Sequence, residues 1–225
     1  MLKNMVISAL FAGFVTGLIV ATLQILMVEP IILEAELYET GQLIHFGDVT
    51  ANMPDIEPEK DWGRSAFSVL ATTAVYIGFA LLMVATFAFA ETKGVEITAR
   101  KGILWGLAGY GAFQLAPAIG LGPELPGMIA AELVPRQIWW TSTILATGAG
   151  IGLIAFGKNW AFWGAGIILI ALPHIIGAPH PDVFGGTIPP ELESEFAGRT
   201  LGLGAVFWAI LGLTTAYFWR KETEV

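Results

Sequence analysis

The residues best suited to metal chemistry lie in one short stretch, LPHIIGAPHPD at 172–182. His174 and His180, two of only three histidines in the chain, stand six residues apart, and Asp182 follows closely. Neutral imidazole binds borderline divalent metals, and a carboxylate adds an oxygen ligand. These three side chains are therefore candidate ligands for a divalent cation, although their spacing is not the helical H-E-x-x-H pattern.

Each of these residues also has a structural interpretation that the sequence leaves open. His174 follows Pro173 and could hydrogen-bond a backbone carbonyl that the proline frees. His180 could be an ordinary loop residue, because loops tolerate any polar side chain. Asp182 follows a proline, in a context that is typical of turns.

A second candidate region is EPIILEAELYE at 29–39, which contains Glu34 and Glu36 among its four glutamates. Pro30 is tolerated at the first position of a helix, so a short helix is expected here. Its glutamates could collect cations at the mouth of a pathway. Alternatively, the segment is an amphipathic interfacial helix whose acids face water.

A third candidate region, GLAGYGAFQLAPAIGLGPELPGM at 106–128, contains Gln114 and Pro117 within an apolar stretch and Glu124 between prolines. A polar residue inside a membrane span usually faces the interior of the bundle. Gln114 could therefore line a pathway, or it could make one hydrogen bond between helices. Glu124 is a further candidate cation ligand.

Composition indicates the solvent in which these residues act. The chain has 225 residues, of which 55% are hydrophobic and 13% charged, whereas soluble domains have about 25% charged residues. The absence of cysteine excludes disulfides and thiolate metal sites. The net charge of −8 argues against nucleic acid as a partner. No P-loop sequence occurs, which excludes that mode of ATP binding.

Apolar stretches of about 20 residues are long enough to cross the hydrocarbon core as helices. We therefore expect an all-α integral membrane protein, a bundle of about six transmembrane helices in a single domain, 1–225, with a long acidic outer loop at 29–65. The fifth stretch is the shortest and contains Pro173, so five spans are an alternative. The expected spans are 5–28, 66–90, 103–119, 137–156, 160–177 and 200–219.

Charge predicts the orientation of these spans. Six spans place both termini on one side, together with seven of the eleven lysines and arginines, so both termini are expected in the cytoplasm of a multi-pass plasma-membrane protein. Fifteen of the nineteen acids fall on the opposite side. That acidic outer surface could concentrate cations, or it could simply keep the protein soluble. His174 and His180 fall at the outer rim.

Small residues and tryptophans predict how the helices pack. Pairs of glycines four residues apart favour close helix crossings inside a compact bundle. Trp139, Trp140 and Trp219 stand at span ends, where tryptophans anchor helices at the membrane interface. The glycine pairs are 13 and 17, 102 and 106, 148 and 152, and 198 and 202.

Several motifs together resemble the CbtA family of predicted cobalt transporter subunits over nearly the whole chain. They are PIILEAELYE, the glycine-rich stretch at 106–128, RQIWW at 136–140, LPHIIGAPHPD with its following IPPEL, FW at 207–208 and WR at 219–220. The resemblance implies inward movement of Co²⁺ as cargo, five spans, and a small one-span CbtB-like partner. It carries metal-binding roles to Glu34, Glu36, Glu124, His174, His180 and Asp182, and a pathway role to Gln114.

Two functions follow as expectations. The first is a membrane subunit of a divalent metal-ion uptake system, with cobalt as the ion and no tightly bound cofactor. The second is a non-transporting structural or accessory subunit of a larger membrane complex or oligomer. An enzyme is not expected, because polar residues at membrane depth are too few to form an acid–base or nucleophilic set.

Overall fold

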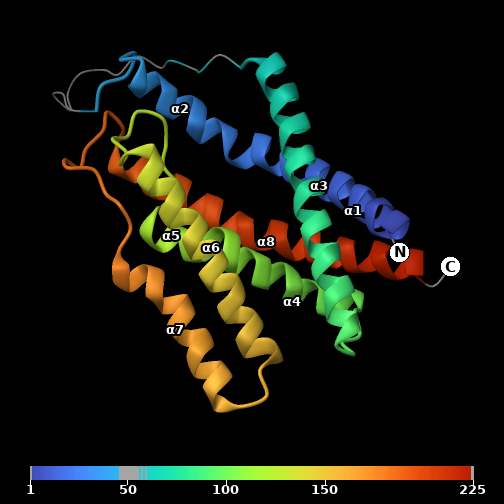
Figure 1. The fold of residues 1–225 in the computed structure, drawn as a ribbon. Helices are drawn as coiled ribbons and strands as arrows, with labels where there is room; N and C mark the ends of the chain where they lie inside the picture. Colours follow the sequence, from blue (N-terminus) through green and yellow to red (C-terminus); the bar gives the residue numbers. More distant parts are fainter. Residues whose placement is uncertain (1, 46–55, 57, 59, 224–225) are drawn as a thin grey trace. The chain divides into compact units, whose positions relative to one another are not determined.

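The computed structural model describes residues 2–45, 56, 58 and 60–223. Within these ranges every regular element is a helix, and one isolated β-bridge joins Met128 to Gly186. The elements, shown in Figure 1, are α1 (Leu2–Met27), α2 (Glu29–Glu39), α3 (Trp62–Thr92), α4 (Ala99–Tyr110), the π-helix η1 (Gly111–Leu115), α5 (Ala116–Gly120), α6 (Leu133–Phe156), α7 (Trp160–Ile176) and α8 (Pro190–Thr223).

Each of the six expected spans falls on a helical stretch, which confirms the all-helical class. Among the described residues, four helices are long and apolar enough to cross a membrane, namely α1, α3, α6 and α8. The apolar α7 has 17 residues, about 25 Å of helix, against a hydrocarbon core of ~30 Å. The third stretch is divided among α4, η1 and α5. The count of six spans therefore stays a prediction.

Side-chain caps and glycines fix where several helices begin and end. The carboxylate of Asp61 accepts hydrogen bonds from the backbone N–H groups of the first turn of α3, and Asn159 does the same for α7. At the end of α2, Gly41 has φ +74°, and at the end of α3, Gly94 has φ +80°. Both glycines take the left-handed conformation that closes a helix with backbone hydrogen bonds.

The π-helix η1 lies where the sequence places a proline inside a helical stretch. Pro117 cannot donate a backbone hydrogen bond to the carbonyl four residues earlier, and its ring crowds that carbonyl. The chain accommodates it by widening to five π-helical residues, Gly111–Leu115, before α5 begins. Gln114 lies in this widened turn. Its side chain is therefore presented differently from a residue on a regular α-helix.

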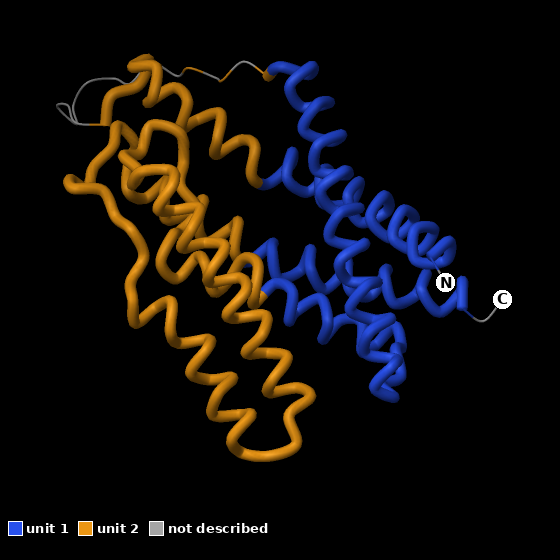
Figure 2. The backbone as a smooth tube through the Cα atoms, viewed as in Figure 1, with its two compact units in different colours: residues 1–27, 61–110, 202–225 blue, residues 28–60, 111–201 orange. Residues whose placement is uncertain are grey.

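The chain divides into two compact units, which Figure 2 shows in different colours. Unit 1 comprises residues 1–27, 61–110 and 202–225, and unit 2 comprises 28–60 and 111–201. Helix α8 begins in unit 2 and continues in unit 1. The single domain expected from the sequence stays a prediction.

In unit 1, glycines allow helices to approach closely. A Cβ atom added to Gly13 would lie 2.3 Å from the Cα of Ile77, and one added to Gly17 would lie 2.6 Å from the Cα of Thr73. A Cβ on Gly106 would lie 2.0 Å from the carbonyl oxygen of Trp208. The first two expected glycine pairs therefore form close crossings of α1 with α3 and of α4 with α8.

The other two glycine pairs do not form crossings in this structure. Gly148 and Gly152 on α6 have open space where a Cβ would stand, and so do Gly198 and Gly202 on α8. On α6 the close contact is made by Gly150 instead, whose added Cβ would lie 2.6 Å from the carbonyl oxygen of Gly166. The expectation is wrong for these two pairs, because the spacing of small residues does not indicate which face of a helix packs against another helix.

The tryptophans at the span ends have different surroundings. Trp139 is 8% exposed and Trp219 is 3% exposed, and each donates a hydrogen bond from its indole nitrogen, to the Pro173 carbonyl and to Glu91 respectively. These two are packing residues rather than lipid-facing anchors. Trp140 is 43% exposed, as an interfacial anchor requires.

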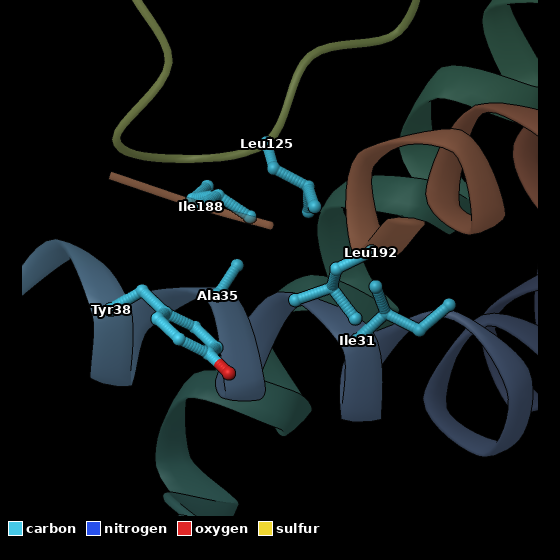
Figure 3. Close-up of a cluster of buried hydrophobic side chains, with 6 residues drawn as sticks. All are labelled: Ile31, Ala35, Tyr38, Leu125, Ile188 and Leu192. Carbon is cyan, nitrogen blue, oxygen red and sulfur yellow. The ribbon is translucent and has the colours of Figure 1, made fainter. Parts of the chain in front are cut away.

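Helix α2 is amphipathic and belongs to the core of unit 2. Figure 3 shows its buried residues Ile31, Ala35 and Tyr38 against Leu125, Ile188 and Leu192. Its glutamates Glu34 and Glu39 are exposed. The expected short helix in the acidic loop at 29–65 is confirmed, and its apolar face packs on protein. Part of that loop, residues 46–55, 57 and 59, lies outside the described residues.

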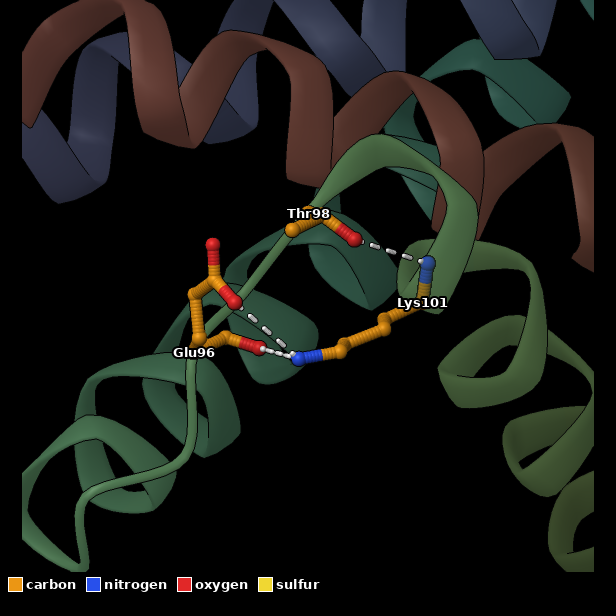
Figure 4. A network of polar contacts seen from close by, with 3 residues as sticks. All are labelled: Glu96, Thr98 and Lys101. Atoms are coloured by element: carbon orange, nitrogen blue, oxygen red, sulfur yellow. Dashed lines mark hydrogen bonds and ion pairs between the residues drawn. The ribbon is translucent and has the colours of Figure 1, made fainter.

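In unit 1, a polar turn precedes α4, as Figure 4 shows. The hydroxyl of Thr98 accepts a hydrogen bond from the backbone N–H of Lys101, which caps the first turn of the helix. The Lys101 ammonium lies 3.3 Å from the Glu96 carboxylate and also donates to the Glu96 carbonyl. Both side chains are well exposed, so this ion pair contributes little stability.

Candidate cation-binding site

A pocket of about 520 Å³ lies in unit 2 where the chain leaves α7. Helix α7 ends at Ile176, and the φ of +90° at Gly177 turns the chain out of the helix. Pro179 and Pro181 then restrict the backbone and keep the segment extended. We call this the loop pocket. It is lined by Ile129, Ala130, Ala131, Glu132, Pro135, Pro179, His180, Pro181, Asp182 and Val183.

The loop pocket contains three side chains that can bind a cation. His180 and Asp182, both expected from the sequence, line it together with Glu132, and all three residues are exposed. Glu132 was not singled out from the sequence. Its position could have indicated it: Glu132 stands directly before the first residue of α6, in a loop that lines the pocket together with the prolines after α7.

Contacts of the His180 ring leave one nitrogen suited to a cation. Its Nδ1 lies 3.2 Å from the carbonyl oxygen of Pro181, and the ring stacks on Phe184 with centroids 5.9 Å apart. A carbonyl oxygen only accepts hydrogen bonds, so this contact requires a proton on Nδ1. The neutral ring then carries its lone pair on Nε2, the arrangement that orients histidine as a metal ligand.

His174 lies on α7 rather than in the loop pocket. Its ring packs edge-on against Trp139, with centroids 5.9 Å apart. Its Nε2 is buried and has no hydrogen-bond partner. The carbonyl of Pro173 accepts from the Trp139 indole at 3.0 Å and from the backbone N–H of Gly177. The buried Nε2 therefore does not make the carbonyl hydrogen bond that the sequence allowed.

Glu124 is paired with a fixed positive charge. Its Oε2 accepts a hydrogen bond from the Nη2 of Arg136 at 2.6 Å, and the two side chains are about one third exposed, at 31% and 27% respectively. Both residues line a second pocket in unit 2, of about 410 Å³. A cation reaching this carboxylate must compete with the guanidinium.

The remaining candidates lie elsewhere in unit 2. Glu34 is exposed on α2 and Glu36 is half-buried there, and neither lines the loop pocket. The pKa of the Tyr38 phenol is raised, mainly because the phenol is buried and also because Glu34 lies near it. Gln114 donates from Nε2 to the carbonyl oxygen of Thr200 at 3.0 Å, the helix-to-helix bond that the sequence allowed.

Residues 2–45, 56, 58 and 60–223 contain no group of three or more His, Asp or Glu side chains placed to hold a metal ion together. The loop pocket thus joins two of the six expected ligands without forming a closed coordination sphere. The metal-binding roles of Glu34, Glu36, Glu124, His174, His180 and Asp182, and the pathway role of Gln114, stay predictions.

Apolar helices of spanning length define the chain as a multi-pass helical membrane protein. It belongs to the CbtA family, described as a probable cobalt transporter subunit, whose model matches residues 2–220. No match was found among curated proteins or among solved structures. The family is thus described as that of a probable transporter subunit, as the motifs in the sequence indicated.

Proposed function

We propose that the chain is a membrane subunit that brings a divalent cation, Co²⁺, into the cell. The observation that carries this proposal is the loop pocket, whose lining includes the imidazole of His180 and the carboxylates of Asp182 and Glu132. Cobalt accepts both imidazole and carboxylate ligands. Membership of a cobalt transporter family supports the choice of metal.

The pocket is suited to capture and release rather than to storage. Its three polar side chains are exposed, so a hydrated cation can reach them and exchange part of its water shell for protein ligands. Conduction requires binding that is strong enough for entry and weak enough for exit. An incomplete ligand set at the pocket fits that requirement better than a closed site would.

With no P-loop in the sequence, the proposed driving force is the membrane potential or a separate energising subunit. Moving one elementary charge across 100 mV is worth about 2.3 kcal/mol, so a divalent cation gains about twice that amount. The proposal places the loop pocket on the outer side and both termini in the cytoplasm. It also includes a small one-span CbtB-like partner and assembly into a larger membrane complex.

Uptake of radioactive Co²⁺ by cells expressing the chain, with and without the one-span partner, tests the function. We expect uptake above that of cells carrying an empty vector, and a several-fold rise in the half-saturating Co²⁺ concentration in His180→Gln and Asp182→Asn variants. Glu191→Gln is a matched control, because Glu191 is exposed in unit 2 but does not line the loop pocket.

Other results would contradict the proposal. If the chain conferred no uptake with its partner present, yet co-purified with other membrane proteins, an accessory role would replace it. If the two loop-pocket variants and the Glu191 control behaved alike, the pocket would not be the entry site. Elemental analysis of the purified protein after exposure to Co²⁺, Ni²⁺ and Zn²⁺ identifies the preferred ion.

A further inference from the structure

The second pocket of unit 2, of about 410 Å³, lies where the spanning helix α6 begins. Four of its lining residues, Leu133, Arg136, Gln137 and Trp140, are spaced three, four and seven apart from the first, so they share one face of the helix. The segment between α5 and α6, which includes Glu124, supplies the other wall. We call this cavity the α6 pocket.

Apolar side chains around the α6 pocket indicate its depth in the membrane. Leu133, Val134 and Ile138 are exposed at the start of a helix that is long and apolar enough to span. Trp140 is also exposed, and its amphipathic ring favours the boundary between hydrocarbon and headgroups. Because Leu133 and Trp140 both line the pocket at the end of a span, it opens at the depth of the lipid headgroups.

Two opposite charges stand side by side in the α6 pocket. Arg136 Nη2 donates to Glu124 Oε2, and about a third of each side chain is exposed. This bond uses one of the five N–H donors of a guanidinium and one of the two oxygens of a carboxylate. Both groups can therefore bind a further ligand while the pair stays intact. The pocket thus suits a ligand that itself carries a negative and a positive charge close together.

The carboxylate side of the α6 pocket is held in place by its neighbours in the chain. Prolines at 123 and 126 flank Glu124 and restrict the backbone there. The next residue, Leu125, is buried in the apolar cluster that Figure 3 shows. Glu124 therefore cannot withdraw from Arg136 without opening that cluster, and the two charges are positioned before any ligand binds.

We propose that the α6 pocket binds a phospholipid with an ethanolamine headgroup, whose phosphate contacts Arg136 and whose primary ammonium contacts Glu124. The planar guanidinium matches the geometry of a phosphate. A primary ammonium donates hydrogen bonds to a carboxylate, whereas the quaternary ammonium of choline has no N–H to donate. A headgroup with only a negative charge would leave Glu124 unmatched. The inference concerns lipid alone and does not depend on metal uptake.

Native mass spectrometry of the purified full chain in detergent tests this, with phosphatidylethanolamine, phosphatidylcholine and phosphatidylglycerol of equal acyl chains added in turn. We expect the ethanolamine lipid to bind roughly fivefold more tightly than the other two, the upper range for a partly exposed ion pair. Arg136→Gln should bind all three weakly. Arg199→Gln is a matched control and should keep the parent's preference, because its ion pair with Glu195 is exposed on α8 outside the pocket.

Glu124→Gln gives a result that poor folding cannot imitate. Without the carboxylate, the positive charge of Arg136 is no longer balanced. Phosphatidylglycerol should then bind roughly fivefold more tightly to the variant than to the parent, and the ethanolamine lipid should lose its advantage. A misfolded protein would lose affinity for every lipid, whereas this variant should gain affinity for one.

Three outcomes would overturn the proposal. The parent chain could bind the three lipids equally, or Glu124→Gln could leave their order unchanged, and the ion pair would then serve only to fix the loop to α6. The Arg199→Gln control could lose the preference as well, which would place lipid selection outside the pocket. Soluble glycerophosphoethanolamine could bind as tightly as the lipid, and the occupant would then be a free zwitterion.

Discussion

The guanidinium of Arg136 donates a hydrogen bond to the carboxylate of Glu124 at 2.6 Å. The negative charge of Glu124, which was expected to attract metal cations, is therefore already balanced by the positive charge of Arg136. Arg136→Gln should free this carboxylate and lower the half-saturating Co²⁺ concentration about two- to fivefold, the scale of an ion pair worth up to about 1 kcal/mol. Cation uptake measured against Co²⁺ concentration checks this. The ion pair of Arg199 with Glu195 is exposed on α8 and provides a control variant, Arg199→Gln.

The two kinds of glycine should respond differently to an added methyl group. Gly106→Ala places a Cβ 2.0 Å from the Trp208 carbonyl oxygen, whereas Gly148→Ala places one in open space. We expect Gly106→Ala to lose about 1–3 kcal/mol of stability through overpacking. Gly148→Ala should be neutral or slightly stabilising, because alanine favours the helix more than glycine does. Equal thermal stability of the two purified variants would show that α4 and α8 do not cross as described.

Gln114→Leu tests whether the amide holds helices together or lines a pathway. Its Nε2 donates to the Thr200 carbonyl, and losing one such bond should cost about 0.5–1.5 kcal/mol of stability. If the role is structural, maximal Co²⁺ uptake per folded molecule should stay within about twofold of the parent, because the bond supports packing without contacting the ion. A large loss of uptake with unchanged stability would assign the pathway role instead.

The raised pKa of Tyr38 predicts a dependence of stability on high pH. The folded state holds the phenol proton more tightly than the unfolded chain, in which tyrosine has a pKa of about 10. Above that pH the unfolded state loses its proton first, so the free energy of unfolding should fall as the pH rises toward the folded pKa. Tyr38→Phe should remove the part of this decrease in unfolding free energy that comes from the phenol of Tyr38.

Glu34→Gln should lower the pKa of Tyr38 partway, because burial rather than the neighbouring charge is the larger cause. The difference between the phenolate absorbance titrations of parent and variant measures this. Glu39→Gln is the control, since Glu39 is exposed on the same helix but is not a cause of the shift. An unchanged titration in Glu34→Gln would show that the carboxylate does not act on the phenol.

Part of the candidate site could be predicted from residue types alone. His180 and Asp182 stand close in sequence among prolines, and local chain stiffness is enough to bring them to one pocket. Glu132 could not be predicted to line the same pocket, because it stands 48 residues before His180 and only the tertiary fold brings both residues to that pocket. The ion pair of Glu124 with Arg136 could not be predicted either, because neither segment of the sequence indicates how close the two side chains lie.

The sequence by itself determined the helical membrane class and the family. Long apolar stretches admit few structures in lipid, where every backbone polar group must be bonded within a helix or a closed barrel. It also placed the short helix after Pro30, since proline and the apolar spacing are local features. Only the tertiary structure decided which glycines meet another helix, which tryptophans are buried, and that His174 and Thr147 keep unpaired atoms inside α6 and α7. These are properties of a helix face, and a face acquires its surroundings only when another helix packs against it.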